Sequence, residues 1–192
     1  TEKGDKVMVM PPVYHPFFLV TQKNEREVVY SPLVLKDGQY HIDFDRFRRD
    51  VQGCKLLILS NPHNPGGRVW TKEELTAVAE ICLKHDVLLV TDEIHADIVY
   101  EGYKHYPLLS LDKRYEENFI LLTAPSKTFN VAGLKASMSI IPNKELQGSY
   151  ASMMKKEKSL GYIYRLANIS NKMLQATLNK DTDTMAEILQ YA

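Results

Sequence analysis

Short apolar runs that alternate with segments of helical periodicity constrain the fold of this chain more than any other feature. Six runs have the length and composition of buried strands: 6–10, 26–32, 54–60, 87–93, 119–124 and 137–142. The runs are apolar on both faces, as strands covered on both sides must be. Because helical patterns lie between several of them, the sequence predicts an α/β fold, a three-layer αβα sandwich with a mostly parallel sheet.

The clearest helical pattern covers residues 72–85. Thr71 and Glu74 have the spacing of a capping box, in which each side chain binds the other residue's backbone N–H. Apolar residues then recur at the spacing of one helix face: Leu75, Val78, Ala79 and Cys82. The segment 43–51 predicts a second, shorter helix.

The pattern changes near residues 142–143, where the last strand-like run ends. We expect residues 1–142 to form the core of one sheet domain, and residues 143–192 to be a helical segment with helices over 143–160 and 164–180. The chain begins with a turn that leads straight into a strand, and it closes in "DTDTMAEILQYA", which resembles a helix cut short. Both ends predict a fragment of a longer protein, with a fold that is incomplete at both ends.

Charge and composition narrow the class of protein. Lys and Arg together number 24, as do Asp and Glu, so there is no electrostatic reason to expect nucleic acid or an anionic membrane as a partner. No apolar run approaches the roughly 18 residues that a membrane-spanning helix needs, and no signal peptide is visible. Cys54 and Cys82 lie in apolar or helical surroundings, which favours buried thiols over a disulfide and fits a reducing compartment. The sequence predicts a cytoplasmic globular protein.

The residues just after the strands are the first candidates for a site, because open α/β sheets bind ligands beyond the carboxyl ends of their strands. Four predicted strand ends carry polar or aromatic groups: Tyr14, "SNPHNPGG" (60–67), "DEIH" (92–95) and "PSKT" (125–128).

Lys127 follows an apolar run and is framed by proline, serine and glycine in "TAPSKTFNVAG". Lysine is seldom buried without a partner. Desolvation lowers the pKa of an amine and makes it nucleophilic, so a lysine here could form a Schiff base. Its position alone favours an amine that reaches solvent or binds a phosphate.

The other strand ends also have more than one interpretation. Asp92 could hold a protonated ring nitrogen through a charge-assisted hydrogen bond, or it could cap the next helix. The run "DEIHAD" (92–97) suggests a metal site, but it lacks an HExxH pattern and a second nearby histidine, so we expect no metal. Asn64 lies in a tight Pro/Gly turn, where its amide could donate to a ligand. Tyr14 could stack on a planar ligand or simply pack.

Taken together and in this order, the four motifs resemble one known family. Tyr14, N-P-x-N-P-G-G, D-E-I-H and S-K-T-F-N-x-A-G-L are similar to the large domain of fold-type I pyridoxal-phosphate enzymes, the class I/II aminotransferase superfamily. Within it, "PPVYHPF", "SNPHNPGGRVWTKEEL", "TDEIHADIVYEGYKH" and "APSKTFNVAGL" resemble the PatB/MalY-like carbon–sulfur β-lyases of the cystathionine β-lyase and cystalysin type. The resemblance covers about residues 5–145 and implies pyridoxal 5′-phosphate as the cofactor.

The resemblance also implies roles for single residues. Lys127 corresponds to the lysine that binds the cofactor as a Schiff base, and Asp92 to the acid that pairs with the pyridine nitrogen. Asn64 corresponds to the amide that binds the cofactor's 3-oxygen, and Tyr14 to the ring that stacks on the pyridine. His95 stands where most aminotransferases have a tyrosine facing the same oxygen, and the PatB/MalY-like branch has a histidine there.

The predicted phosphate site departs from the family pattern. Ser126 is expected to reach the phosphate. Lys135 stands eight residues after Lys127, where aminotransferases often have an arginine, and a lysine offers a point charge without the bidentate fork. Ala124 stands where a serine is frequent. The family's small-residue phosphate loop and its carboxylate-binding arginine have no counterpart in this chain.

The function that the resemblance implies is a β-lyase that releases thiol, pyruvate and ammonia from cystathionine or a related cysteine conjugate. The histidine at position 95 favours this over the alternative, a class I/II aminotransferase that transfers an amino group to a 2-oxo acid. A non-enzymatic regulator or cofactor-binding module with the same fold is a third possibility, against which the intact pair Lys127 and Asp92 argues. The partners expected are a small amino-acid substrate and a second subunit in a homodimer. Alone, this chain is expected to be inactive.

Overall fold

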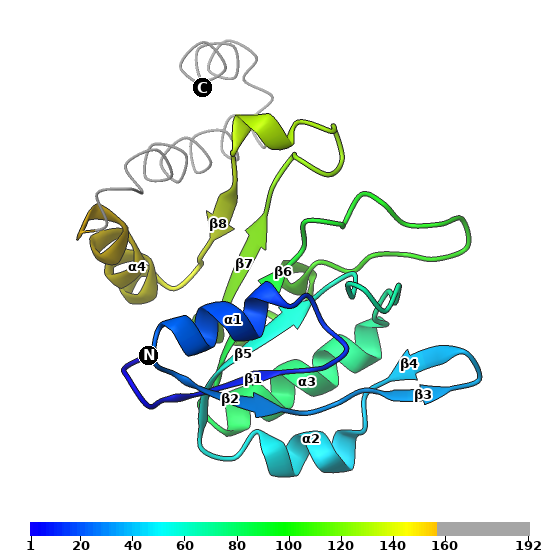
Figure 1. The fold of residues 1–192 in the computed structure, drawn as a ribbon, viewed down its shortest axis with the longest axis horizontal. Coiled ribbons are helices and arrows are strands. Elements are labelled where there is room, and N and C mark those ends of the chain that lie inside the picture. Colours follow the sequence, from blue (N-terminus) through cyan, green and yellow to red (C-terminus); the bar gives the residue numbers. More distant parts are fainter. Residues whose placement is uncertain (157–192) are drawn as a thin grey trace.

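A six-stranded sheet organises residues 1–156, the part of the chain that the computed structural model describes (Figure 1). The strand order is β2-β1-β5-β6-β7-β8. The first five of these strands run parallel, whereas β8 pairs antiparallel with β7 at one edge. The strands are β1 (Lys6–Val9), β2 (Glu27–Tyr30), β5 (Cys54–Ser60), β6 (Leu88–Asp92), β7 (Phe119–Thr123) and β8 (Met138–Ile140). All six predicted strands are therefore confirmed, and the sheet is mostly parallel as expected.

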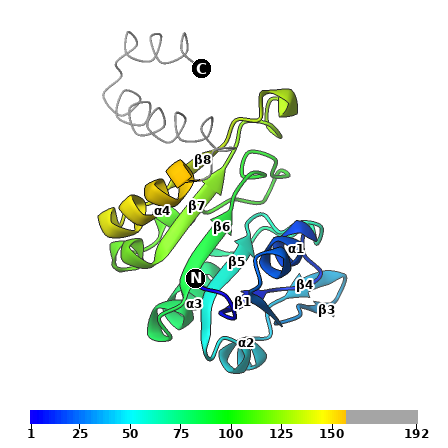
Figure 2. The ribbon, with the colours of Figure 1, turned by 60° about the vertical axis from the view of Figure 1, so that its left-hand side comes forward.

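Both faces of the sheet are covered, which explains why its strands are apolar on both sides. In β5, Leu57 and Leu59 belong to one core cluster, while Ile58 packs against the other. The helices α2 (Phe44–Asp50) and α3 (Lys72–Lys84) contribute to the first cluster. The helix α1 (Pro16–Lys23) contributes Phe17 to the second, and Figures 1 and 2 show it on the opposite face. This three-layer arrangement confirms the predicted fold class.

Helix α3 begins with the capping box that the sequence predicts. Thr71 Oγ1 accepts a hydrogen bond from the Glu74 N–H at 3.2 Å, and Glu74 Oε2 accepts one from the Thr71 N–H at 2.8 Å. The predicted apolar stripe is buried, and Val78 and Cys82 are fully so. The two caps satisfy backbone donors that the first turn of a helix leaves without partners.

Replacing Thr71 by alanine is expected to lower the free energy of unfolding by about 1 kcal/mol, because the Glu74 N–H loses its acceptor. Denaturant unfolding of the full-length protein would measure the loss. Thr76→Ala is the matched control, since the Thr76 hydroxyl donates to the Lys72 carbonyl at 2.7 Å inside the same helix and satisfies no orphan donor. An equal loss in both variants would contradict a specific capping role.

The structure adds elements that the sequence analysis did not predict. Helix α1 has Pro16 at its first position and no side-chain cap from His15, so the usual start signal is missing. The strands β3 (Val34–Lys36) and β4 (Gln39–His41) form a two-stranded hairpin that projects from the sheet domain (Figure 1). Short 3₁₀ turns complete this set: η1 (Leu108–Ser110), η2 (Lys113–Asn118) and η3 (Ala132–Leu134).

The hairpin does carry a local signal in the sequence. Its two turn residues, Asp37 and Gly38, both have positive φ, at 51° and 76°. An Asp-Gly pair in this conformation is a preferred two-residue hairpin turn, because its twist matches that of the flanking strands. The short and exposed strands on either side of it lack the apolar alternation by which strands are recognised.

The last described helix, α4 (Lys144–Lys156), follows β8 after a short connection. It agrees with the start of the helix predicted over 143–160. The predicted helix at 164–180 and the remainder of the proposed segment 143–192 lie outside the described residues. The division of the chain at 142–143 stays a prediction.

The two cysteines are buried and unpaired, as the sequence predicts. Burial raises the pKa of the Cys54 thiol to about 11 and that of the Cys82 thiol to about 12. Both therefore remain protonated at neutral pH and act as apolar core groups. Among the described helices, none is long and apolar enough to cross a membrane.

Candidate functional site

The four strand ends that carry the predicted site residues are neighbours in the sheet. Strands β1, β5, β6 and β7 lie side by side and parallel, so their carboxyl ends meet at one edge. Tyr14 follows β1, Asn64 follows β5, Asp92 ends β6 and Lys127 follows β7. The topology thus brings together four segments that are far apart in the sequence, at the edge where α/β sheets bind ligands.

A cavity of about 340 Å³ opens beside these strand ends. Asn64 and His95 both line it, and Gln39 from the β3–β4 hairpin forms part of another wall. A volume of this size lies within the range of small-molecule sites. Of the predicted residues, these two line the cavity; Tyr14, Asp92, Ser126, Lys127 and Lys135 do not.

The turn that follows β5 holds Asn64 through its own backbone. The Asn64 N–H donates to Ser60 Oγ at 3.1 Å, and that hydroxyl donates to the Pro62 carbonyl at 3.0 Å. The side chain of Asn64 is half-buried and makes no hydrogen bond with any other described residue. Its amide is therefore available to a ligand in the cavity.

His63 connects this turn to the segment that carries Tyr14. The His63 Nε2–H donates to the Pro12 carbonyl at 2.7 Å, and an isolated β-bridge joins Val13 to Pro65. Burial lowers the pKa of His63, which favours the neutral imidazole, and the carbonyl acceptor requires a proton on Nε2. These contacts fix the position of the turn after β5 relative to the segment after β1.

Gly66 allows this turn to pack closely. A Cβ added at Gly66 would lie 2.9 Å from His63 Cδ2 and 3.1 Å from Tyr40 Cδ2. No side chain fits there without displacing the ring that binds Pro12.

Asp92 presents a half-buried carboxylate at the end of β6. Its Oδ1 accepts a hydrogen bond from the Ile94 N–H at 3.1 Å, and Oδ2 makes no hydrogen bond within residues 1–156. Burial raises the pKa of this carboxyl, which the Ile94 N–H and the charge of His95 partly oppose. A partly desolvated carboxylate with one unused oxygen is suited to accept a hydrogen bond from a cationic ligand.

Lys127 is exposed, which is one of the alternatives that its position in the sequence leaves open. Its side chain is exposed and makes no hydrogen bond or ion pair with the described residues, so they do not desolvate its amine. The reason is its position on the connection 124–137 between β7 and β8, which extends away from the sheet (Figure 1). The amine is left free to bind a ligand.

Tyr14 is also largely uncovered, with 43% of its surface exposed. Its ring makes edge-type contacts with Phe17 at 5.7 Å and with His15 at 5.6 Å between centroids. These contacts orient the ring without enclosing it.

The two predicted phosphate ligands lie on the same connection as Lys127. Ser126 is half-buried, and its carbonyl accepts a hydrogen bond from the Val131 N–H at 3.1 Å. Lys135 is exposed and has a left-handed backbone, with φ of 50°, at the end of η3. Nothing in the described residues brings the two side chains into contact.

No group of three or more His, Cys, Asp or Glu side chains within residues 1–156 is arranged to hold a metal ion. The carboxylates and the histidine of 92–97 point to different surroundings. Asp97, for example, accepts a hydrogen bond from Thr128 Oγ1 at 2.7 Å.

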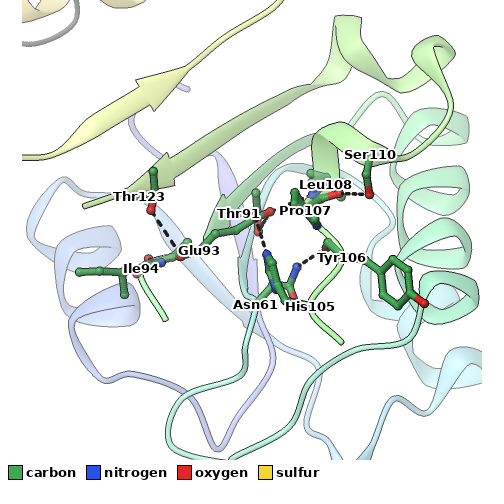
Figure 3. A network of polar contacts seen from close by, with 11 residues as sticks. Asn61, Thr91, Glu93, Ile94, His105, Tyr106, Pro107, Leu108, Ser110 and Thr123 are labelled. Carbon is green, nitrogen blue, oxygen red and sulfur yellow. Dashed lines mark hydrogen bonds and ion pairs between the residues drawn. The ribbon is translucent and has the colours of Figure 1, made fainter. Parts of the chain in front are cut away.

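The sequence analysis assigned no role to Glu93, which the structure shows to be the most deeply buried acid near the site. Its side chain is 3% exposed, and Oε2 lies 2.9 Å from Nε2 of His105, which is 9% exposed (Figure 3). An acidic residue directly after a buried strand was a signal for such a group. Its partner twelve residues later carried no local signal.

Comparison with known proteins agrees with this arrangement. The family described as "Aminotransferase class I and II" matches residues 1–192. Cystathionine beta-lyase PatB of Bacillus subtilis is 39% identical over 193 residues, which cover 100% of this chain and 49% of PatB. Kynurenine–oxoglutarate transaminase 3 of Rattus norvegicus is 35% identical over 150 residues, which cover 73% of this chain and 33% of the transaminase.

Among solved structures, cystalysin from Treponema denticola, which contains a pyridoxal 5′-phosphate cofactor, superposes with a TM-score of 0.80. It is 40% identical, and the match covers 82% of this chain and 40% of cystalysin. The chain thus spans about half the length of PatB, or less for the other two proteins. Because the family match extends over all of it, the chain belongs to the class I and II aminotransferase family.

Proposed function

We propose that the whole protein is a pyridoxal-phosphate-dependent carbon–sulfur β-lyase. It would release thiol, pyruvate and ammonia from cystathionine or a related cysteine conjugate. The observation that carries the proposal is the meeting of the Tyr14, Asn64, Asp92 and Lys127 segments at one sheet edge, beside a cavity lined by Asn64 and His95. The likeness to PatB and cystalysin supports both the cofactor and the reaction.

The donor set fits such a cofactor. The unused Oδ2 of Asp92 suits a protonated ring nitrogen, and the free amide of Asn64 suits a phenolate-type oxygen. The exposed amine of Lys127 has no competing partner among the described residues. When bound, pyridoxal phosphate supplies an electron sink for a carbanion at the α-carbon of an amino acid.

The side chains of this chain would then share the remaining work. Lys127 would hold the cofactor through its amine and would take the α-proton of the substrate as general base. Asp92 keeps the ring nitrogen protonated, and Tyr14 stacks on the ring. Ser126 and Lys135 contribute to the phosphate site, with Lys135 acting as a point charge.

His95 supports the lyase over the transaminase. It lines the cavity with Asn64, where an imidazole gives a smaller wall than the phenol usual in aminotransferases. The room left beside the substrate's β-carbon suits departure of a thiolate. The transaminase remains the second candidate, because the likeness to kynurenine–oxoglutarate transaminase 3 is also strong and the same cofactor residues serve both reactions.

A side-by-side assay tests this choice. We expect the full-length protein to release pyruvate and free thiol from cystathionine faster than it forms amino acid from any member of a 2-oxo-acid panel. His95→Tyr should narrow that difference, because the larger phenol restores the wall of an aminotransferase. Robust transamination without thiol release would overturn the lyase and leave the cofactor assignment standing.

The same proposal includes the protein's setting. We place the enzyme in the cytoplasm as a homodimer that acts on a small amino-acid substrate. The two buried free thiols are consistent with a reducing compartment. Residues 1–142 would form the core of the cofactor-binding large domain, and 143–192 would lead toward a small C-terminal domain.

A further inference from the structure

The chain leaves the sheet after β6 and returns to it near η1, and both points are tied to one buried carboxylate. Glu93 Oε2 pairs with His105 Nε2 at 2.9 Å, while Oε1 accepts a hydrogen bond from the Leu108 N–H at 2.9 Å (Figure 3). The Thr91 hydroxyl also donates to Oε1, at 3.4 Å. A buried carboxylate that accepts several hydrogen bonds is held in a fixed position. Removing one of its partners destabilises the structure around it, because the charge is then left without full compensation.

A second anchor holds the returning chain from the neighbouring strand. Asn61 is fully buried, and its Nδ2 donates to the Tyr106 carbonyl at 3.0 Å (Figure 3). The Asn61 N–H donates to the Asp92 carbonyl at 2.9 Å. The clasp formed by Asn61, Glu93 and His105 therefore fixes residues 94–104 at both ends, next to Asp92.

Between these anchors, residues 94–104 have little support of their own. Their backbone N–H groups donate four hydrogen bonds, from Ile94, Ala96, Ile98 and Tyr103, and each reaches back only two or three residues. No strand donates a backbone hydrogen bond to this segment within residues 1–156. Its position thus depends on the clasp more than on its local structure.

This segment forms an apolar wall of the cavity. Ile98, Tyr100 and Tyr103 line the cavity and are 55%, 87% and 61% exposed. Large apolar side chains held at a cavity, and not in the core, are suited to contact a ligand. Asn64, from the β5 turn, lines the same cavity.

The segment also contacts the turn that carries Lys127. Thr128, the next residue, donates from Oγ1 to Asp97 Oδ2 at 2.7 Å. The position of residues 94–104 is therefore coupled to that of the turn that carries Lys127.

We propose that residues 94–104 form the wall that contacts the thiol leaving group, and that Asn61, Glu93 and His105 are positioning residues that hold this wall. The inference rests on the proposed lyase function for the identity of the leaving group. The clasp touches neither the cavity nor the proposed cofactor ligands' side chains, so it acts through the segment.

The test uses the full-length holoenzyme with His105→Phe, which keeps an aromatic ring and removes the nitrogen that pairs with Glu93. We expect amide hydrogen exchange in residues 94–104 to rise about tenfold, the effect of losing one charged hydrogen bond. We also expect kcat/KM for cystathionine to fall about tenfold, mainly through a higher KM. The kcat/KM for S-methylcysteine should stay within about threefold of wild type, because only the large leaving group reaches the wall.

Glu80→Gln is the matched control. Glu80 accepts a hydrogen bond from the Tyr115 hydroxyl at 2.9 Å and pairs with Arg114 at an exposed site on α3, so neither exchange in 94–104 nor the substrate ratio should change. If His105→Phe leaves the exchange unchanged, or lowers kcat/KM equally for both substrates, the clasp only supports the fold and the inference fails.

Tyr103→Ala tests the wall without disturbing the clasp, and because the Tyr103 side chain is exposed, its removal leaves the core intact. The kcat/KM for cystathionine should again fall more than that for S-methylcysteine, while amide hydrogen exchange in residues 94–104 stays as in the wild type. If the ratio of the two kcat/KM values does not change, residues 94–104 do not contact the leaving group and the inference fails. If thiol release is absent from the wild type altogether, the proposed function fails, whereas the exchange result still decides the clasp.

Discussion

Replacing Lys127 by alanine is expected to abolish covalent attachment of the cofactor and to lower kcat by at least about 10²–10⁴-fold, the contribution of a positioned proton-transfer group. Lys127 is the one strand-end lysine of the site and has an exposed amine without a partner among the described residues. Borohydride reduction of the wild-type holoenzyme, followed by peptide mass spectrometry, should find the cofactor on residue 127.

The control for this experiment is Lys113→Ala, an exposed lysine in η2 on a different segment. It should keep both the label and the activity of the wild type. A Lys127→Ala protein that still carries the cofactor on another residue after reduction would show that the assignment is wrong. The fold should be unaffected, because no buried contact is removed.

Asp92→Asn is expected to lower kcat on the order of 10²–10³-fold, the usual effect of losing one preorganised electrostatic contact. The amide is nearly isosteric and still accepts the Ile94 N–H through its oxygen, but it cannot stabilise a ring cation. Steady-state kinetics with cystathionine would measure the loss. Activity within a few-fold of wild type would show that Asp92 is only structural.

Asp92→Asn should lower activity but should not lower the thermal stability of the protein. Because burial raises the pKa of Asp92 above its ordinary 3.8, the ionised carboxylate is disfavoured by folding at neutral pH. Asparagine removes that penalty, so the cofactor-free variant should melt at the same temperature as wild type or higher. The difference should shrink as the pH falls toward 3.8, since the native carboxyl then takes up its proton.

Asp112→Asn is a close control, because Asp112 Oδ1 also accepts the N–H two residues ahead, that of Arg114, at 3.0 Å. Asp112 is exposed and lies before η2, away from the strand ends. It should leave kcat unchanged. A similar loss of activity in both variants would indicate a general effect of the substitution and not a role for Asp92.

The elements that depend on neighbouring residues could be predicted from the sequence. The six strands follow from short apolar runs, and α3 follows from a capping box and a stripe of period 3.6. The position of the four motifs at one edge of the sheet followed as well, because a parallel sheet aligns its carboxyl ends, whereas the strand order that makes them neighbours came from the structure. The Asp37–Gly38 hairpin was also within reach of local rules.

The contacts between residues far apart in the chain could not be predicted in this way, because they depend on the tertiary fold. His63 meets Pro12 across 51 positions, and Asn61 meets Tyr106 across 45. These pairings depend on strand order and on the path of each loop, which no periodicity records. The exposure of Lys127 belongs to the same class, because it depends on where the β7–β8 connection goes after leaving the sheet. Local patterns fix which segments form strands and helices, whereas the burial and pairing of polar side chains depend on how those segments close on one another.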